Sequence, residues 1–163
     1  SSHWNPILTE ALAHGDVDGA IASVAVAPGP SALLDDRDWI DAAYAGDDLI
    51  RIVQRLDADH PDVARKVRRA CPTSCAVALR ALRNAAEFTG LRQTLDQDLR
   101  MAVRLQARPD FVEGVRAQVI DKDRQPRWEP PTVEELDHTA VDACFAPLGD
   151  AELGLHHTER ESA

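Results

Sequence analysis

The chain has 163 residues, of which 44% are hydrophobic but only 4% aromatic, so its core must consist mainly of alanine, valine, leucine and isoleucine. The net charge of -10, and the lack of aromatic residues between the arginines, disfavour non-specific nucleic-acid binding. There is no apolar run of the roughly 20 residues that a membrane span needs, and the three cysteines include no Cys-x-x-Cys pair. We therefore expect a soluble, cytoplasmic protein with reduced thiols and no membrane partner.

The charge is distributed unevenly along the chain. Residues 64–127 contain 14 basic and 7 acidic side chains, whereas both flanking segments are strongly acidic. A basic segment of this kind either binds a polyanion or pairs with the acidic helices around it. We favour local pairing, because runs of charge are usually solvated faces. Polyanion binding stays open as the alternative.

Apolar residues at helical spacing predict helices through the first seventy residues. Asn5 and Asp16 are suited to cap the first two helices, and the second is expected to end at the Pro-Gly-Pro sequence of residues 28–30. The expected helices cover approximately residues 5–14, 16–26, 35–44, 49–56 and 59–70.

Two longer helices follow. Thr73 or Ser74 is expected to cap the first, which ends at Gly90, and the second covers approximately residues 91–107. The apolar stripes that they are expected to bury are Cys75, Ala78, Leu79, Leu82 and Ala86 in the first and Leu91, Leu95, Leu99 and Val103 in the second. Short helical segments are expected after Thr132 and near residues 141–145. The sequence therefore predicts an all-α chain.

Residues 109–121 are predicted to form the helix around which the C-terminal half is organised. Pro109 is suited to the first turn, where the amide hydrogen that it lacks would have no partner. Gly114 and Ala117 share a face on which a neighbouring group can approach closely. The buried stripe is predicted to comprise Phe111, Val115 and Val119, with Val112 and Ile120 beside them.

The run PDFVEGVRAQVIDKDRQPRWEP, residues 109–130, resembles the C-terminal signature of the 3-hydroxyisobutyryl-CoA hydrolases, a branch of the enoyl-CoA hydratase/isomerase (crotonase) superfamily. The sequences CPTS at 71–74 and FAPLG at 145–149 resemble other parts of the same family. No stretch resembles the half of the family that carries its oxyanion-hole glycines and catalytic carboxylates. The resemblance thus implies the C-terminal helical region of an α/β crotonase-type fold whose core lies in a missing N-terminal half.

The resemblance also implies a division of the chain and a function. Residues 1–71 are expected to lead out of the crotonase core, 72–155 to form the C-terminal helical region with its signature helix, and 156–163 to be a frayed tail. The intact protein is expected to hydrolyse 3-hydroxyisobutyryl-CoA in valine degradation, with coenzyme A as part of the substrate and no separate cofactor. This chain would cover the active site and be inactive alone.

Two other functions stay open. One is a hydratase or isomerase of the same superfamily, since one scaffold hosts many chemistries, and the other is a non-enzymatic helical interaction module. The expected partners are an acyl-CoA substrate and the missing N-terminal half of the same protein, and a homo-oligomer is left open.

Lys122 and Arg124 are the candidate coenzyme A contacts. In the superfamily, basic residues near the end of the chain often touch the nucleotide end of coenzyme A, and by resemblance this role falls on these two residues. The alternative, which we favour from the residues alone, is a turn in which they pair with Asp121 and Asp123.

Three further side chains in this region are given structural roles. Glu113 is expected to pair with Arg116 across one helical turn, although holding an active-site loop is an alternative. Trp128 is expected to bury its ring against the helices, with stacking on an adenine as the alternative.

No residue of this chain is assigned a catalytic or metal-binding role. Two groups have the chemistry of metal ligands: His156 and His157 with Glu152 and Glu159, and the pair Cys71 and Cys75. We interpret the first group as a solvated tail, because no second cluster stands at ligand spacing. We interpret the cysteines as structural, because a proline separates them.

Overall fold

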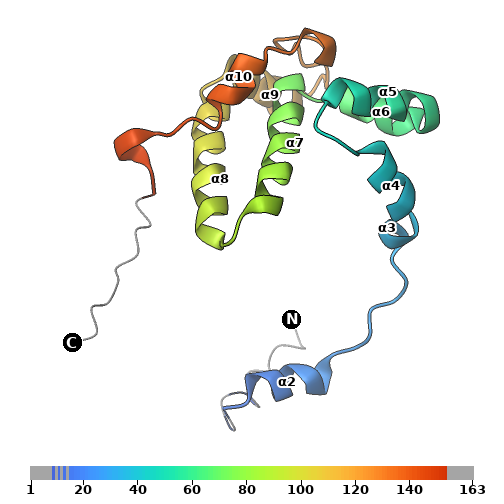
Figure 1. The fold of residues 1–163 in the computed structure, drawn as a ribbon, viewed down its shortest axis with the longest axis vertical. Coiled ribbons are helices and arrows are strands. Elements are labelled where there is room, and N and C mark those ends of the chain that lie inside the picture. Colours follow the sequence, from blue (N-terminus) through green and yellow to red (C-terminus); the bar gives the residue numbers. More distant parts are fainter. Residues whose placement is uncertain (1–8, 10, 12, 14, 154–163) are drawn as a thin grey trace. The chain divides into compact units, whose positions relative to one another are not determined.

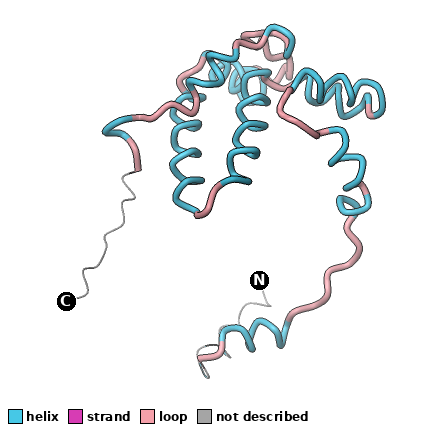
Figure 2. Tube along the Cα trace, viewed as in Figure 1, coloured by secondary structure: helices cyan, strands magenta, loops and turns pink. Residues whose placement is uncertain are grey.

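The computed structural model describes residues 9, 11, 13 and 15–153, and within this part every regular element is a helix (Figure 2). The chain divides into two units, residues 1–40 and 41–163, which are described separately. None of the described helices has the length and apolar character needed to cross a membrane. The helix expected over 5–14 lies largely outside the described residues, and the tail 156–163 lies wholly outside them. Our three-part division stays a prediction.

In the first unit, helix α2 (Val17–Val24) begins where the sequence predicted. The carboxylate of Asp16 accepts a hydrogen bond from the Gly19 N–H at 2.9 Å, which confirms Asp16 as the N-cap. Helices α3 (Ala32–Asp35) and α4 (Arg37–Ala43) take the place of the single helix expected near residue 35. They are separate because Asp36 ends α3, with its N–H bonded to carbonyls within that helix.

The second unit contains helices α5 (Leu49–Asp59) and α6 (Pro61–Arg69), which pack against each other. Asp48 caps α5, since its carboxylate accepts the N–H groups of Ile50 and Arg51 at 2.9 and 3.2 Å. The side chains that these two helices bury completely or almost completely are Ile52, Val53, Leu56 and Ala64. This unit therefore has an apolar core of its own.

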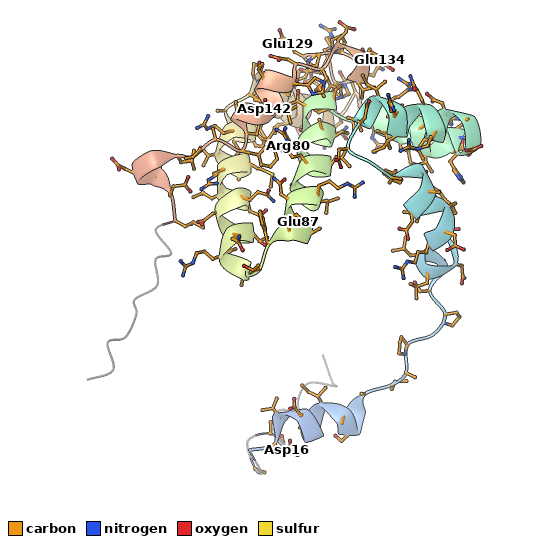
Figure 3. The ribbon with its side chains drawn as sticks, viewed as in Figure 1. Asp16, Arg80, Glu87, Glu129, Glu134 and Asp142 are labelled. Carbon is orange, nitrogen blue, oxygen red and sulfur yellow. The ribbon has the colours of Figure 1, made fainter. Side chains whose placement is uncertain are left out.

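Helices α7 (Pro72–Glu87) and α8 (Leu91–Gln106) run side by side (Figure 1). Helix α10 (His138–Ala143) packs on α7, and together they bury a cluster of Ala76, Val77, Val141 and Cys144. Arg80 of α7 forms an ion pair with Asp142 of α10 (Figure 3). This ion pair joins two residues that are 62 positions apart in the sequence, so α10 returns to α7 from a distant part of the chain.

The faces that α7 and α8 bury differ from the predicted stripes. Leu82 and Leu91 are 69% and 72% exposed, whereas Gln97 is buried. The Gln97 amide accepts a hydrogen bond from Asn84 at 2.8 Å and donates one to the carbonyl of Ala81 at 3.2 Å, which satisfies its polar groups. The reason for the error is that periodicity shows the spacing of apolar residues but does not show which face meets a neighbour.

The helix expected over 109–121 is present as α9 (Pro109–Val115) followed by the π-helical turn η1 (Arg116–Ile120). An extended loop with a cis Glu129–Pro130 bond then leads to the 3₁₀ helix η2 (Val133–Glu135). A last 3₁₀ helix, η3 (Gly149–Ala151), follows α10. The loop of residues 121–131, which we call the signature loop, connects α9 and η1 to η2.

We predict that Leu56→Ala lowers the free energy of unfolding by about 2 to 5 kcal/mol, because Leu56 is fully buried and its truncation leaves a cavity. Leu82→Ala is the matched control, since the same truncation at an exposed leucine should change stability by less than about 0.5 kcal/mol. Urea unfolding of both variants measures the difference. Equal losses would contradict the assignment of the core to α5.

Candidate functional site

Arg116, in the π-helical turn, is the centre of an ion-pair cluster that fixes the signature loop. Its guanidinium donates to four acceptors: the carboxylates of Glu113, Asp121 and Asp123, each at 2.7 Å, and the carbonyl of Gln125, at 3.2 Å. We call these five residues the Arg116 cluster. The predicted pairing of Glu113 with Arg116 is confirmed. Glu113 also accepts the N–H of Arg127 at 2.7 Å, so one carboxylate joins the helix to the far part of the loop.

The cluster changes the acid–base properties of its members. The hydrogen bonds from Arg116 and from the Arg127 N–H lower the pKa of Glu113 to about 2. The pKa of Asp123 is lowered by Arg116 and by the Gln125 N–H. Both carboxylates are therefore held ionised by the donors around them.

Lys122 and Arg124 lie in this loop with left-handed backbone angles, φ 58° and 57°. Asp121 and Asp123 are paired with Arg116, and within residues 15–153 neither Lys122 nor Arg124 forms an ion pair. The salt-bridged turn that we favoured is therefore wrong. Its acids are bound instead by a planar guanidinium, which can hold several carboxylates at once.

Asp110 fixes the other end of the signature loop, a role that the sequence did not reveal. Its side chain is 7% exposed and accepts the N–H of Glu129 at 2.8 Å. The Arg108 guanidinium contacts Asp110 at 3.3 Å, the carbonyl of Glu129 at 3.0 Å and the hydroxyl of Thr73 at 3.4 Å. From the sequence alone, an acid in the first turn of a helix suggests only a favourable interaction with the positive end of the helix dipole. No local pattern indicated a partner nineteen residues away.

Trp128 packs against the signature helix as predicted. Its indole N–H donates to the carbonyl of Arg69 at 3.0 Å, at the end of α6. A Cβ atom on Gly114 would lie 3.3 Å from the ring atom Cη2, so the glycine permits the close approach of the ring. The predictions for Gly114 and Trp128 are confirmed.

An apolar groove of about 340 Å³ includes Trp128 in its lining. Its apolar lining includes Phe111, Val115, Val119 and Trp128. The stripe that we expected to be buried is therefore exposed: Phe111 is 50% and Val119 63% accessible. The helix instead buries Asp110 and Ala117, because Trp128 and the loop pack on the face that carries its small residues.

A second pocket, of about 470 Å³, also includes Trp128 in its lining. We call it the basic pocket; it is lined by Arg68, Arg69, Arg124, Gln125, Pro126, Arg127, Trp128 and Pro131. Arg124 thus lies in its wall, whereas Lys122 is not among its lining residues. The proposed coenzyme A contacts at Lys122 and Arg124 stay a prediction.

The described residues include no cluster of three or more histidine, cysteine or acidic side chains that could hold a metal ion. Burial raises the pKa of the Cys75 and Cys144 thiols, which disfavours their reactive thiolate forms. The proposed histidine tail lies outside the described residues. The arrangement is suited to binding, with a cationic and an apolar pocket whose linings share one tryptophan.

We predict that Glu113→Gln destabilises the protein at neutral pH but has a progressively smaller effect in acid. Ionised Glu113 contributes stability above its ordinary pKa of 4.5, and this contribution is lost as the pH falls through its folded value of about 2. Urea unfolding of both proteins over this range measures the difference. Glu87→Gln is the control, since the Glu87 side chain (Figure 3) is exposed and forms no ion pair or side-chain hydrogen bond with the described residues. A destabilisation that does not change with pH would contradict the prediction.

Comparison with known proteins places this geometry in a family. Residues 2–145 match the family model described as enoyl-CoA hydratase/isomerase. A mitochondrial 3-hydroxyisobutyryl-CoA hydrolase of Gallus gallus is 37% identical over 120 residues, which are 71% of this chain and 31% of the relative. The resemblance stated from the sequence is confirmed. The chain spans about a third of that relative's length.

Two solved structures are similar in fold. A carnitinyl-CoA dehydratase from Mycobacterium thermoresistibile superposes with a TM-score of 0.79 at 35% identity. An enoyl-CoA hydratase from Rhodobacter sphaeroides 2.4.1 superposes with a TM-score of 0.76 at 34% identity. Each alignment covers 93% of this chain and 44% of the solved chain.

These findings correct the fold class that we expected. We had predicted a helical region of a crotonase-type fold whose core lay in a missing half, but nearly the whole chain aligns with crotonase-fold enzymes. The described residues form helices, yet the chain is part of the crotonase domain itself rather than a fragment without a core. The error arose because helical periodicity does not show whether helices lie inside or beside a domain. The chain belongs to the enoyl-CoA hydratase/isomerase family.

Proposed function

We propose that this chain serves an acyl-CoA thioester hydrolase of the 3-hydroxyisobutyryl-CoA hydrolase type, acting in valine degradation. The identity to a hydrolase of that name supports the choice of reaction and of acyl group. The enzyme would act on the thioester with no separate cofactor, since coenzyme A is part of the substrate. A cytoplasmic location and a homo-oligomer are further proposals.

One observation carries the proposal: the signature loop presents Lys122 and Arg124 without ion pairs in the described part of the chain, while Arg116 holds the loop's acids. Coenzyme A has phosphates at one end and an acyl chain at the other. Arg124 lines the basic pocket and Trp128 lines both this pocket and the apolar groove. Cations and an apolar surface that share one tryptophan suit a ligand of this mixed character.

In this function the chain's own residues bind and orient the thioester. Lys122 and Arg124 would contact the nucleotide end, where charge-assisted hydrogen bonds to phosphate oxygens are strong. Phe111 and Val119 would shield the acyl end from water. We assign no catalytic residue here and propose that the chain alone does not turn over.

A hydratase or isomerase is the second candidate, because the two solved structures carry the names of a dehydratase and a hydratase. The two reactions differ in their products. Hydrolysis releases a free thiol, which a thiol reagent detects, whereas hydration consumes a conjugated double bond and its ultraviolet absorbance. Offering both a 3-hydroxyacyl-CoA and an enoyl-CoA to the intact enzyme would distinguish them.

We predict that Lys122→Gln and Arg124→Gln each weaken binding of coenzyme A to this chain by about tenfold, the cost of one charge-assisted contact. Isothermal titration calorimetry measures the dissociation constants. Lys66→Gln is the matched control, because Lys66 is the other lysine of the chain and lines neither of the two pockets. Unchanged affinity in both loop variants would contradict the proposed roles of Lys122 and Arg124.

A further inference from the structure

The basic pocket contains more positive charge than the loop cations alone would supply. Of the residues that line it, four are arginines and none is acidic. Two of them, Arg68 and Arg69, come from the end of α6, more than fifty residues before the loop in the sequence. The whole chain carries a net charge of -10, so this concentration of cations runs against its overall charge.

Arg68 is the one arginine of the pocket whose charge is already compensated. It forms ion pairs with Asp57 at 2.6 Å and with Glu134 at 2.9 Å. The other three make no ion pair with the part of the chain that the structure describes. Elsewhere in the second unit, arginines usually have a carboxylate partner: Arg51 with Asp48, Arg65 with Asp62, Arg80 with Asp142, Arg83 with Asp47 and Arg100 with Glu152. Three arginines in the pocket lining therefore form no ion pair with the described residues, although the charge of Arg127 also helps to lower the pKa of Glu113.

The backbone of each of these three arginines is held by a hydrogen bond. The Arg69 carbonyl accepts from the Trp128 indole at 3.0 Å. The Arg124 N–H donates to the carbonyl of Ala117 at 3.0 Å, and the Arg127 N–H donates to Glu113 at 2.7 Å. The guanidinium groups therefore start from fixed points around one pocket, which lowers the entropy cost of binding a shared ligand.

A ligand that carries a phosphate group matches the hydrogen-bond donors and the charge of these arginines best. Guanidinium groups donate planar pairs of hydrogen bonds that match the oxygens of a phosphate. The pocket volume of about 470 Å³ is many times the roughly 30 Å³ share of one water molecule, so it can accept a diphosphate. An anion there would also reduce the mutual repulsion of the three cations.

We propose that Arg69, Arg124 and Arg127 form a phosphate site in the basic pocket, which binds a phosphomonoester or diphosphate group. If the group belongs to coenzyme A, the proposal rests on the function proposed above. It then adds Arg69 of α6 and Arg127 to the binding residues. A free phosphate or nucleotide is the other source of the same chemistry.

Inorganic diphosphate is the direct probe, titrated calorimetrically into the full chain at low ionic strength. We expect saturable binding that Arg69→Gln and Arg127→Gln each weaken by about tenfold or more. Both substitutions retain the backbone groups that hold the loop. Arg65→Gln is the control, because Arg65 lies on the same helix, pairs with Asp62 at 2.8 Å and does not line the pocket. Urea unfolding of all three variants checks that the fold is retained.

No saturable binding of diphosphate, or an equal loss in Arg65→Gln, would overturn the phosphate site. A parallel titration with coenzyme A separates this proposal from the proposed function. If diphosphate binds through Arg69 and Arg127 but coenzyme A does not bind, the site stands and the function fails. If coenzyme A binds and neither substitution weakens it or diphosphate binding, the function stands and the site fails.

Discussion

The ion pair between Arg116 and Glu113 is the interaction on which the rest of the candidate site depends. Through it, a helical carboxylate is oriented to accept the N–H of Arg127, and the same guanidinium reaches the acids of the signature loop. An exposed ion pair alone contributes little to stability. In a network, however, a side chain ordered by one contact makes the next at a lower entropy cost. The importance of Arg116 therefore lies in the number of acceptors that it holds together.

The loop is held at both ends, by chemically different contacts. The Arg116 cluster holds the start of the loop. At the far end of the loop, Asp110 accepts the Glu129 N–H and the Trp128 ring packs against Gly114. Holding both ends allows Lys122 and Arg124 to keep left-handed backbone angles, which side chains other than glycine rarely adopt. The result is a preorganised loop in which Asp121 and Asp123 bind Arg116, while Lys122 and Arg124 form no ion pair with the described residues.

Much of the helix layout could be predicted from the sequence, because it follows from local chemistry. Asp16 caps α2 through its own carboxylate, and the small side of Gly114 indicated a close neighbour. Partner choice could not be predicted. Asp121 and Asp123 have lysine and arginine as sequence neighbours, yet both bind Arg116, which the π-helical turn brings near. The prediction of which face α9 buries was wrong for a similar reason. That face depends on where Trp128, a later residue of the chain, packs against the helix.

Net charge and local charge have different consequences for recognition. At physiological ionic strength, interactions between exposed charges fade beyond about 8 Å, so a bound anion responds mainly to the charges close to it. An extended polyanion contacts much of the surface and is therefore repelled by the overall charge of -10. The basic pocket, by contrast, has Arg69, Arg124 and Arg127 in its lining, and the proposed small anion would lie among them. Arg68 adds little to that field, because Asp57 and Glu134 already pair with it. On the phosphate site proposed above, an acidic protein could bind a compact phosphate group although its net charge disfavours nucleic acid, because the local charge of this pocket differs in sign from the charge of the whole chain.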